Sequence, residues 1–429
     1  MTGNRTKIGW ISASALVIAN MIGTGVFTSL GFQLASVQNT WSIVSLWAIG
    51  GIMALFGAFS YAELGTKLPR SGGEYHFITK TLHPLPGYLS GWVSLTVGFA
   101  APVALAAMAM ASYLSSYTIV SPVIMAVLVV TLISVVHSIH LRQSERFQNL
   151  FTLLKLLVIA VLILLCFVLA PAEGNLDWSG TWKNEVMILP AYAVSLVFVS
   201  YSYSGWNAAA YIVEEIRDLR ENLPRALILG TALVAVLYIL AQLAFLKAAP
   251  VEALVNKVEV GQIAAEHILG KAGGQMISIV IAVLLISSIS AMVWVGPRVT
   301  KTLAEDYRLW RPLSQVNANG IPVRATWLQW AISVTLTVTG SFEEVLLYSG
   351  FILQAFSMLA VIGMIRLRMS DPGKPGYNSP GYPYIQIAFL LFGSWILIFM
   401  IYDRPVESFY GLLNLAVGAL TYWYSLKMK

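Results

Sequence analysis

Long runs of apolar residues, separated by short polar segments, follow one another along almost the entire chain. A helix needs about 20 mostly apolar residues to cross the hydrocarbon core of a bilayer. Twelve runs meet this requirement and predict spans over residues 8–34, 41–66, 86–116, 121–140, 147–170, 188–213, 225–247, 274–300, 326–342, 345–366, 383–402 and 406–426. The longest loops between them, 171–187 and 248–273, are too short for a soluble domain. The pattern therefore predicts an all-α polytopic membrane protein with about twelve transmembrane helices.

The basic residues test this count and set an orientation. With the N-terminus in the cytoplasm, 20 of the 26 Lys and Arg residues fall in cytoplasmic segments and five in external ones. Such a bias is the rule for membrane proteins, and an odd number of spans would remove it. We therefore expect a multi-pass protein of the cell membrane with both termini in the cytoplasm. The remaining basic residue, Lys155, lies inside a predicted span.

Composition supports the same class and excludes others. Charged residues make up only 11% of the 429 positions and hydrophobic residues 58%, whereas a soluble domain carries about 25% charged residues. The distribution of the net charge of +6 follows membrane topology, so we expect no nucleic-acid partner. The single cysteine, Cys166, excludes an internal disulfide framework and reads as a small core or lipid-facing residue.

The first and sixth spans contain small and polar residues at mid-membrane. Residues 20–27 read Asn-Met-Ile-Gly-Thr-Gly-Val-Phe, and residues 201–207 read Tyr-Ser-Tyr-Ser-Gly-Trp-Asn. Either segment alone is also compatible with close helix packing, because small residues recur at helix contacts in membranes. The two segments begin the two halves of a five-plus-five arrangement. Interruptions at corresponding positions of two halves point to a transporter site at the midplane.

Unwound backbone inside a membrane must meet protein, a cavity or a ligand, because lipid offers no hydrogen bonds. The N-terminus of a resumed half-helix presents free N–H groups and positive partial charge, which suit a carboxylate. The C-terminus of the preceding half presents carbonyl groups, which suit an ammonium. Two such breaks predict a receptor for a zwitterion, which favours an α-amino acid as the transported solute.

Several motifs in a fixed order carry a family resemblance over nearly the whole chain. They occupy residues 21–27, 62–64, 69–75, 87–92, 204–207, 214–216, 222–226 and 296–298. The chain resembles the amino acid–polyamine–organocation transporters, and among them the L-type amino acid transporters and their bacterial relatives. The resemblance implies an inverted-repeat fold, with residues 8–170 as the first repeat, 188–366 as the second, and two additional helices over 383–426.

The resemblance also implies site residues. The substrate carboxylate would meet the backbone N–H groups of Thr24 and Gly25 and the Thr24 hydroxyl. The amino group would meet the carbonyl groups of Met21, Tyr201 and Ser204. The residues expected to bind substrate are Met21, Gly23, Thr24, Gly25, Gly98, Tyr201, Ser204 and Asn207.

The remaining implied roles concern selectivity. Tyr201 falls where the family has an aromatic gate, Asn207 at a polar lining position, and Gly98 on the third-span face that borders the side-chain pocket. Relatives that accept cations often carry an acidic residue at or near Ser204 or Asn207, and here neither is acidic. No Asp or Glu lies deep in any predicted span. Because a buried cation without a counter-charge is costly, we expect neutral L-amino acids.

Lys155 lies nine residues beyond Arg146, which is roughly 13–14 Å into the membrane at 1.5 Å per residue. A lysine at mid-helix costs about 2.5–3.5 kcal/mol on insertion scales, and snorkelling to the membrane surface is one alternative. The resemblance implies instead that its ammonium replaces a sodium ion near Ser287 or Ser288, and that transport is independent of sodium. A permanently charged lysine suits an obligatory exchanger, and one that gains and loses a proton suits proton-coupled uptake.

Other groups and partners are expected to be absent. Animal L-type transporters join a heavy chain through an external cysteine between spans three and four, and this chain has only Cys166, so we expect no disulfide-linked heavy chain. His137 and His140 have no clustered carboxylate or cysteine nearby, so neither a metal nor another cofactor is expected. Glu63 is interpreted as a helix-end or loop contact, with pairing to a basic residue as the alternative.

The leading hypothesis is a sodium-independent secondary transporter that exchanges neutral L-amino acids by alternating access. A proton-coupled amino acid symporter is the alternative mechanism, and an amino acid sensor that does not transport could keep the same site. A membrane-embedded enzyme would need a cluster of polar catalytic groups at one depth. No nucleophile–base pair is evident in the spans, so the protein is not expected to be an enzyme.

Overall fold

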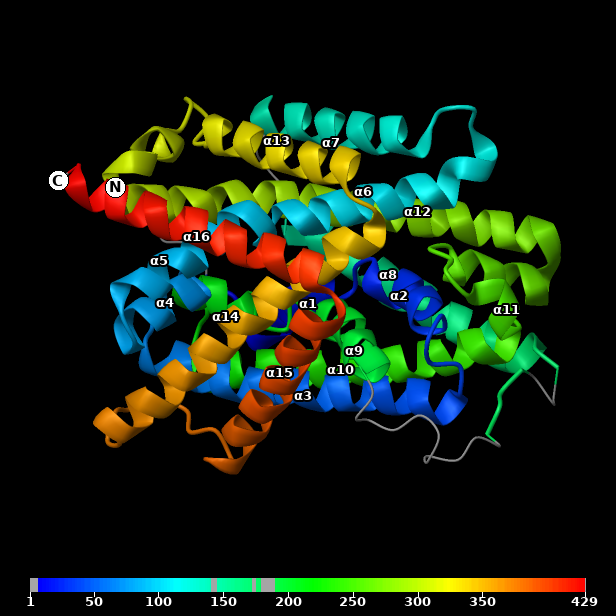
Figure 1. Ribbon diagram of the computed structural model, residues 1–429, viewed down its shortest axis with the longest axis horizontal. Helices are drawn as coiled ribbons and strands as arrows, with labels where there is room; N and C mark the ends of the chain where they lie inside the picture. The colour runs from blue at the N-terminus through cyan, green and yellow to red at the C-terminus, as the bar shows by residue number, and fades with distance from the viewer. Residues whose placement is uncertain (1–6, 140–144, 172–174, 179–189, 429) are drawn as a thin grey trace.

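The computed structural model describes residues 7–139, 145–171, 175–178 and 190–428, and these residues are almost entirely helical (Figure 1). The only β-pairing among them is a bridge that ties Ile8 to Ile216. The helices are α1 (Trp10–Met21), α2 (Gly25–Gln33), α3 (Thr40–Lys67), α4 (Gly73–Thr81), α5 (Pro84–Val93), η1 (Ser94–Gly98), α6 (Ala100–Leu114), η2 (Ser115–Tyr117), α7 (Pro122–Ile139), α8 (Glu145–Leu169), α9 (Pro190–Tyr203), η3 (Ala208–Glu215), α10 (Leu219–Ala248), α11 (Val251–Leu254), α12 (Val260–Asp306), η4 (Arg308–Ser314), α13 (Val323–Thr339), α14 (Phe342–Ser370), α15 (Tyr384–Asp403) and α16 (Pro405–Lys427).

Apart from α4, α11 and η4, which lie between spans, these helices fall in the twelve predicted spans. Nine segments of the described residues are long and apolar enough to cross a membrane. Of the other three, the sixth span is interrupted so that α9 has only 14 residues, α13 has 17 residues, and α16 has 23 residues but is less apolar. Large apolar side chains such as Leu128, Leu157 and Leu420 are exposed on the outer surface, as lipid-facing side chains are. The prediction of a multi-pass helical membrane protein is confirmed.

Figure 1 shows α4 and α11 at opposite ends of the bundle. Because α4 follows the second span and α11 follows the seventh, this separation agrees with spans that alternate in direction. Helix α11 and the first turns of α12 fold within the predicted loop over residues 248–273. The backbone turns at Gly270, whose φ of 71° favours glycine, and this turn separates the outer part of α12 from its spanning part.

The centre of the bundle surrounds the two interrupted spans. Helix α10 packs along α3 and against α1, and α12 packs along α6. Aromatic rings fill the space between these helices: Trp47 lies edge-on to Tyr203 and to Tyr238, with ring centroids 5.8 and 5.6 Å apart. Cys166 is fully buried, which agrees with its interpretation as a core residue.

Candidate functional site

The first span is broken where the sequence predicts. Helix α1 ends at Met21, and the next residue, Ile22, has a non-helical backbone with φ −75° and ψ 88°. Helix α2 begins at Gly25, and the side chain of its N-cap residue, Thr24, does not cap it. The first N–H groups of a helix have no partner within the helix. The start of α2 therefore offers donors that suit an anionic group.

The sixth span is broken at a corresponding place. Helix α9 ends at Tyr203, and the Ser204 N–H donates to the Tyr201 carbonyl at 2.9 Å. Gly205 has a φ of 98°, a conformation that favours glycine. The chain resumes after Asn207 as the 3-10 helix η3 and not as an α-helix. The second half of this span is therefore wound differently from the second half of the first span.

The two breaks lie against each other. A Cβ atom on Gly205 would lie 2.7 Å from the carbonyl carbon of Asn20 and 2.8 Å from its oxygen, so only glycine fits there. On the other side of the breaks, the hydroxyls of Ser29 and Ser202 are 2.9 Å apart. Gly25 also packs so closely against Ser202 that a side chain would not fit. The fold thus brings together two segments that are about 180 residues apart in the chain.

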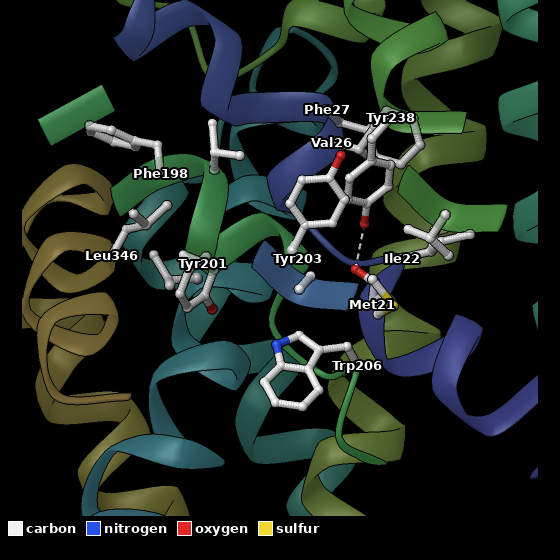
Figure 2. Packing of buried hydrophobic residues seen from close by; sticks show 14 of the residues in the cluster. Met21, Ile22, Val26, Phe27, Phe198, Tyr201, Tyr203, Trp206, Tyr238 and Leu346 are labelled. Carbon is white, nitrogen blue, oxygen red and sulfur yellow. Dashed lines mark hydrogen bonds between the residues drawn. The ribbon is translucent and has the colours of Figure 1, made fainter. Parts of the chain in front are cut away.

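The predicted acceptor at Met21 already has partners. Figure 2 shows the Tyr238 hydroxyl of α10 pointing at the Met21 carbonyl, to which it donates at 2.5 Å. The Gly23 N–H donates to the same oxygen at 2.9 Å. Because a carbonyl oxygen has two lone pairs, both are used in this conformation. No pattern in the sequence distinguishes Tyr238, which is one tyrosine in a long apolar helix.

A cavity of about 50 Å³ lies between α3, the end of α9 and α14. It is lined by Tyr201 and Ser204 of the sixth span and by Gln354 and Ser357 of α14, among others. A water molecule needs about 10–15 Å³ by this kind of measure, so the cavity has room for a few waters. Its lining includes no residue of the first span. Of the predicted binding residues, the structure therefore gathers only Tyr201 and Ser204 around this cavity.

The third span contributes an irregular turn beside the cavity. Gly98 ends the π-helical turn η1, a rare form that often occurs at functional sites. An added Cβ on Gly98 would lie 3.9 Å from the side chain of Leu353, which also lines the cavity. Gly98 is therefore close to the cavity, and the sequence motif alone did not reveal the π-helical turn.

A buried carboxylate contacts the sixth-span break. Asn207 donates from Nδ2 to Oε1 of Glu74 at 3.0 Å, and the Tyr61 hydroxyl donates to the same oxygen at 2.5 Å. Glu74 belongs to α4, outside the predicted spans, and burial raises the pKa of its carboxyl group. Glu74 could not be found from the acidic residues of the spans, because it lies on α4 between two spans and only the fold brings it to the break.

Lys155 bridges three spans. Its side chain is 4% exposed. Its Nζ lies 2.8 Å from the Ser288 hydroxyl of α12 and 3.5 Å from the Ala19 carbonyl near the end of α1. The ammonium thus contacts protein groups and does not snorkel to the membrane surface. Of the two serines named from the sequence, Ser288 makes this contact.

Glu63 has both of the roles considered from the sequence, a loop contact and pairing with a basic residue. It is 1% exposed, and its carboxylate accepts from Lys67 at 2.8 Å, from Arg368 of α14 at 2.9 Å and from the Ser379 N–H at 2.8 Å. The residue therefore both contacts a loop and pairs with basic side chains. His137 lies 2.8 Å from the Ser290 hydroxyl, and His140 lies outside the described residues.

Comparison with known proteins gives matches over nearly the whole chain. A family model described as amino acid permease matches residues 8–421. The chain is 27% identical over 431 residues to the large neutral amino acids transporter small subunit 2 of Mus musculus, covering 98% of this chain and 81% of that protein. It is 25% identical over 434 residues to the b(0,+)-type amino acid transporter 1 of Mus musculus, covering 98% and 88%. With two broken spans that meet at mid-bundle and this match over nearly its full length, the chain belongs to the amino acid permease family and is an amino acid transporter, not an enzyme.

Proposed function

We propose that the protein is a sodium-independent transporter of neutral L-amino acids that exchanges one for another by alternating access. The observation that carries this proposal is the position of Lys155, whose ammonium lies between the broken first span and α12. The Lys155 ammonium would take the place that a coupling cation would need. A transporter that has its own cation at this point has no requirement for a sodium gradient.

The substrate would bind mainly through backbone groups at the two breaks. Its carboxylate would meet the N–H groups of Thr24 and Gly25 at the uncapped start of α2 and the Thr24 hydroxyl, where N–H groups and the helix dipole favour an anion. Its amino group would meet carbonyl groups at the ends of α1 and α9. In this conformation Tyr238 occupies the Met21 carbonyl, so substrate binding would require this hydroxyl to share the oxygen or move.

The preference for neutral substrates follows from the charges near the breaks. Ser204 and Asn207 are uncharged, and the lining of the cavity contains no acidic residue. A cationic side chain would find no counter-charge in that lining and would be costly to desolvate. One relative is named for large neutral amino acids, which agrees with this proposal.

The proposal also includes the topology of the chain and its partners. Residues 8–170 and 188–366 would form two inverted repeats, with both termini on the cytoplasmic side and α15 and α16 as additional helices. The only cysteine is buried in α8, so the protein would function without a disulfide-linked heavy chain.

Flux measurements on purified protein in liposomes test the proposal. Exchange predicts that labelled neutral amino acids enter only when the lumen is preloaded with unlabelled amino acid, with or without sodium. Entry into empty vesicles driven by a pH gradient would instead indicate the proton-coupled alternative. Binding without flux in both formats would indicate a sensor, and a requirement for sodium would contradict the role given to Lys155.

A further inference from the structure

Glu74 is a buried carboxylate that connects several elements around the sixth-span break. It lies on α4 and is 6% exposed. Its Oε1 accepts from the Tyr61 hydroxyl of α3 and from Nδ2 of Asn207, at 2.5 and 3.0 Å. The hydroxyls of Tyr211 in η3 and Ser357 in α14 also interact with its carboxyl group. One side chain therefore links α4 to three helices and to the break itself.

The groups around Glu74 fit its ionised form. Every partner can donate a hydrogen bond, and the amide nitrogen of Asn207 can only donate. In the described part of the chain, the carboxyl group faces hydroxyl and amide groups and no basic side chain. Hydrogen bonds to a charged carboxylate are roughly twice as strong as those to a neutral group. Protonation of Glu74 would therefore weaken its hydrogen bonds with Asn207 and with the surrounding hydroxyls.

These contacts reach the site in two ways. Asn207 belongs to the break, and Ser357 lines the cavity that Tyr201 and Ser204 also border. We propose that Glu74 is a positioning residue whose ionised carboxylate holds the sixth-span break ready for substrate, and that uptake of a proton by Glu74 weakens substrate binding. The inference rests on the proposed transport of amino acids and adds a residue and a pH dependence to it.

Burial and hydrogen bonds act on the pKa of Glu74 in opposite directions. Desolvation by burial raises the pKa of Glu74 above its ordinary value of 4.5, and the hydrogen bonds from Tyr61 and Asn207 oppose this rise. Burial, followed by the charges of Arg70 and Lys80, lowers the pKa of His76 on the same helix to about 4, so this side chain is neutral across the pH range of the test below.

The test is the half-saturation concentration for exchange of a labelled neutral amino acid in preloaded liposomes, with equal pH on both sides, between about pH 5 and pH 8. For the wild type we expect this concentration to rise about fivefold as the pH falls, since charge-assisted hydrogen bonds are lost. Glu74→Gln keeps an oxygen for Tyr61 and Asn207 but has no charge. We expect its half-saturation concentration to be high and independent of pH.

A second variant separates titration from a structural effect. Tyr61→Phe removes one donor to the carboxylate, and donors favour the ionised form, so the midpoint of the pH dependence should move to higher pH. Glu266→Gln, at an exposed glutamate on the outer part of α12, is the matched control and should keep the wild-type profile.

Three results would overturn the inference: a flat wild-type profile, a Glu74→Gln profile that follows the wild type, or a Tyr61→Phe midpoint that does not move. The last result decides the question if Glu74→Gln does not fold. Absence of exchange in the wild type at every pH would overturn the proposed function instead.

Discussion

Replacement of Lys155 by methionine tests the bridge between the broken first span and α12. The variant keeps a long unbranched side chain and removes the ammonium. It loses the 2.8 Å hydrogen bond to Ser288 and the 3.5 Å contact with the Ala19 carbonyl. The longer contact is at the limit of hydrogen-bond geometry, so we count only the first. A hydrogen bond that involves a charged group contributes about 1.5–3 kcal/mol.

This energy sets the size of the expected effect. If the bridge forms in only some states of the transport cycle, its loss shifts the equilibrium between states with and without the bridge by about 10- to 150-fold. We expect the exchange rate to fall by a factor in the same range. Loss of folding does not explain such a decrease, because removing a lysine from mid-membrane also removes an insertion cost of about 2.5–3.5 kcal/mol.

The assay is exchange of a labelled neutral amino acid in preloaded liposomes that contain equal amounts of folded protein, with and without sodium. Lys247→Met is the matched control. Lys247 donates to the Phe167 carbonyl at 3.0 Å and lies over that ring, but it is in the last turn of α10 and far along the chain from both breaks. Turnover of Lys155→Met at the wild-type rate would refute the reasoning.

Three further variants probe the breaks and the ion-paired end of α3. Gly205→Ala should abolish exchange, because its Cβ would lie 2.7 Å from first-span backbone at a φ of 98°. Gly373→Ala is the control and should keep exchange, because a Cβ on Gly373 would meet no atom within 4 Å. Equal exchange activity of the two variants would contradict this explanation. Tyr238→Phe frees the Met21 carbonyl for the substrate, so the half-saturation concentration of this variant should fall about fivefold. A rise would show that the hydroxyl orients the break and does not compete with the substrate for this carbonyl. Glu63→Gln leaves the buried Lys67 and the partly exposed Arg368 without their carboxylate. Removing one partner of a buried ion pair costs about 3–5 kcal/mol, so thermal unfolding in detergent should begin at lower temperature, whereas Glu266→Gln should unfold like the wild type. An unchanged midpoint for Glu63→Gln would mean that the pair adds no net stability.

The spans and their interruptions could be predicted because both depend on local composition. A segment crosses the membrane when about 20 neighbouring residues are apolar, and it unwinds where glycine and small polar residues remove helix propensity. Each of these properties depends on residues that are close together in the sequence. The same criterion predicts only that residues 248–273 lie between two spans, and it does not predict the helical turns that fold there.

The sequence alone therefore determined the number of spans, the two broken segments and the presence of a lysine inside the fifth span. Only the tertiary structure decided that Tyr238 occupies the Met21 carbonyl, that Glu74 lies under the sixth-span break, and that Ser288 is the serine that meets Lys155. The physical reason is that burial in a membrane depends on the composition of one helix. A hydrogen-bond partner depends on how separate helices rotate and pack, and a tyrosine or glutamate looks the same in the sequence whichever group it meets.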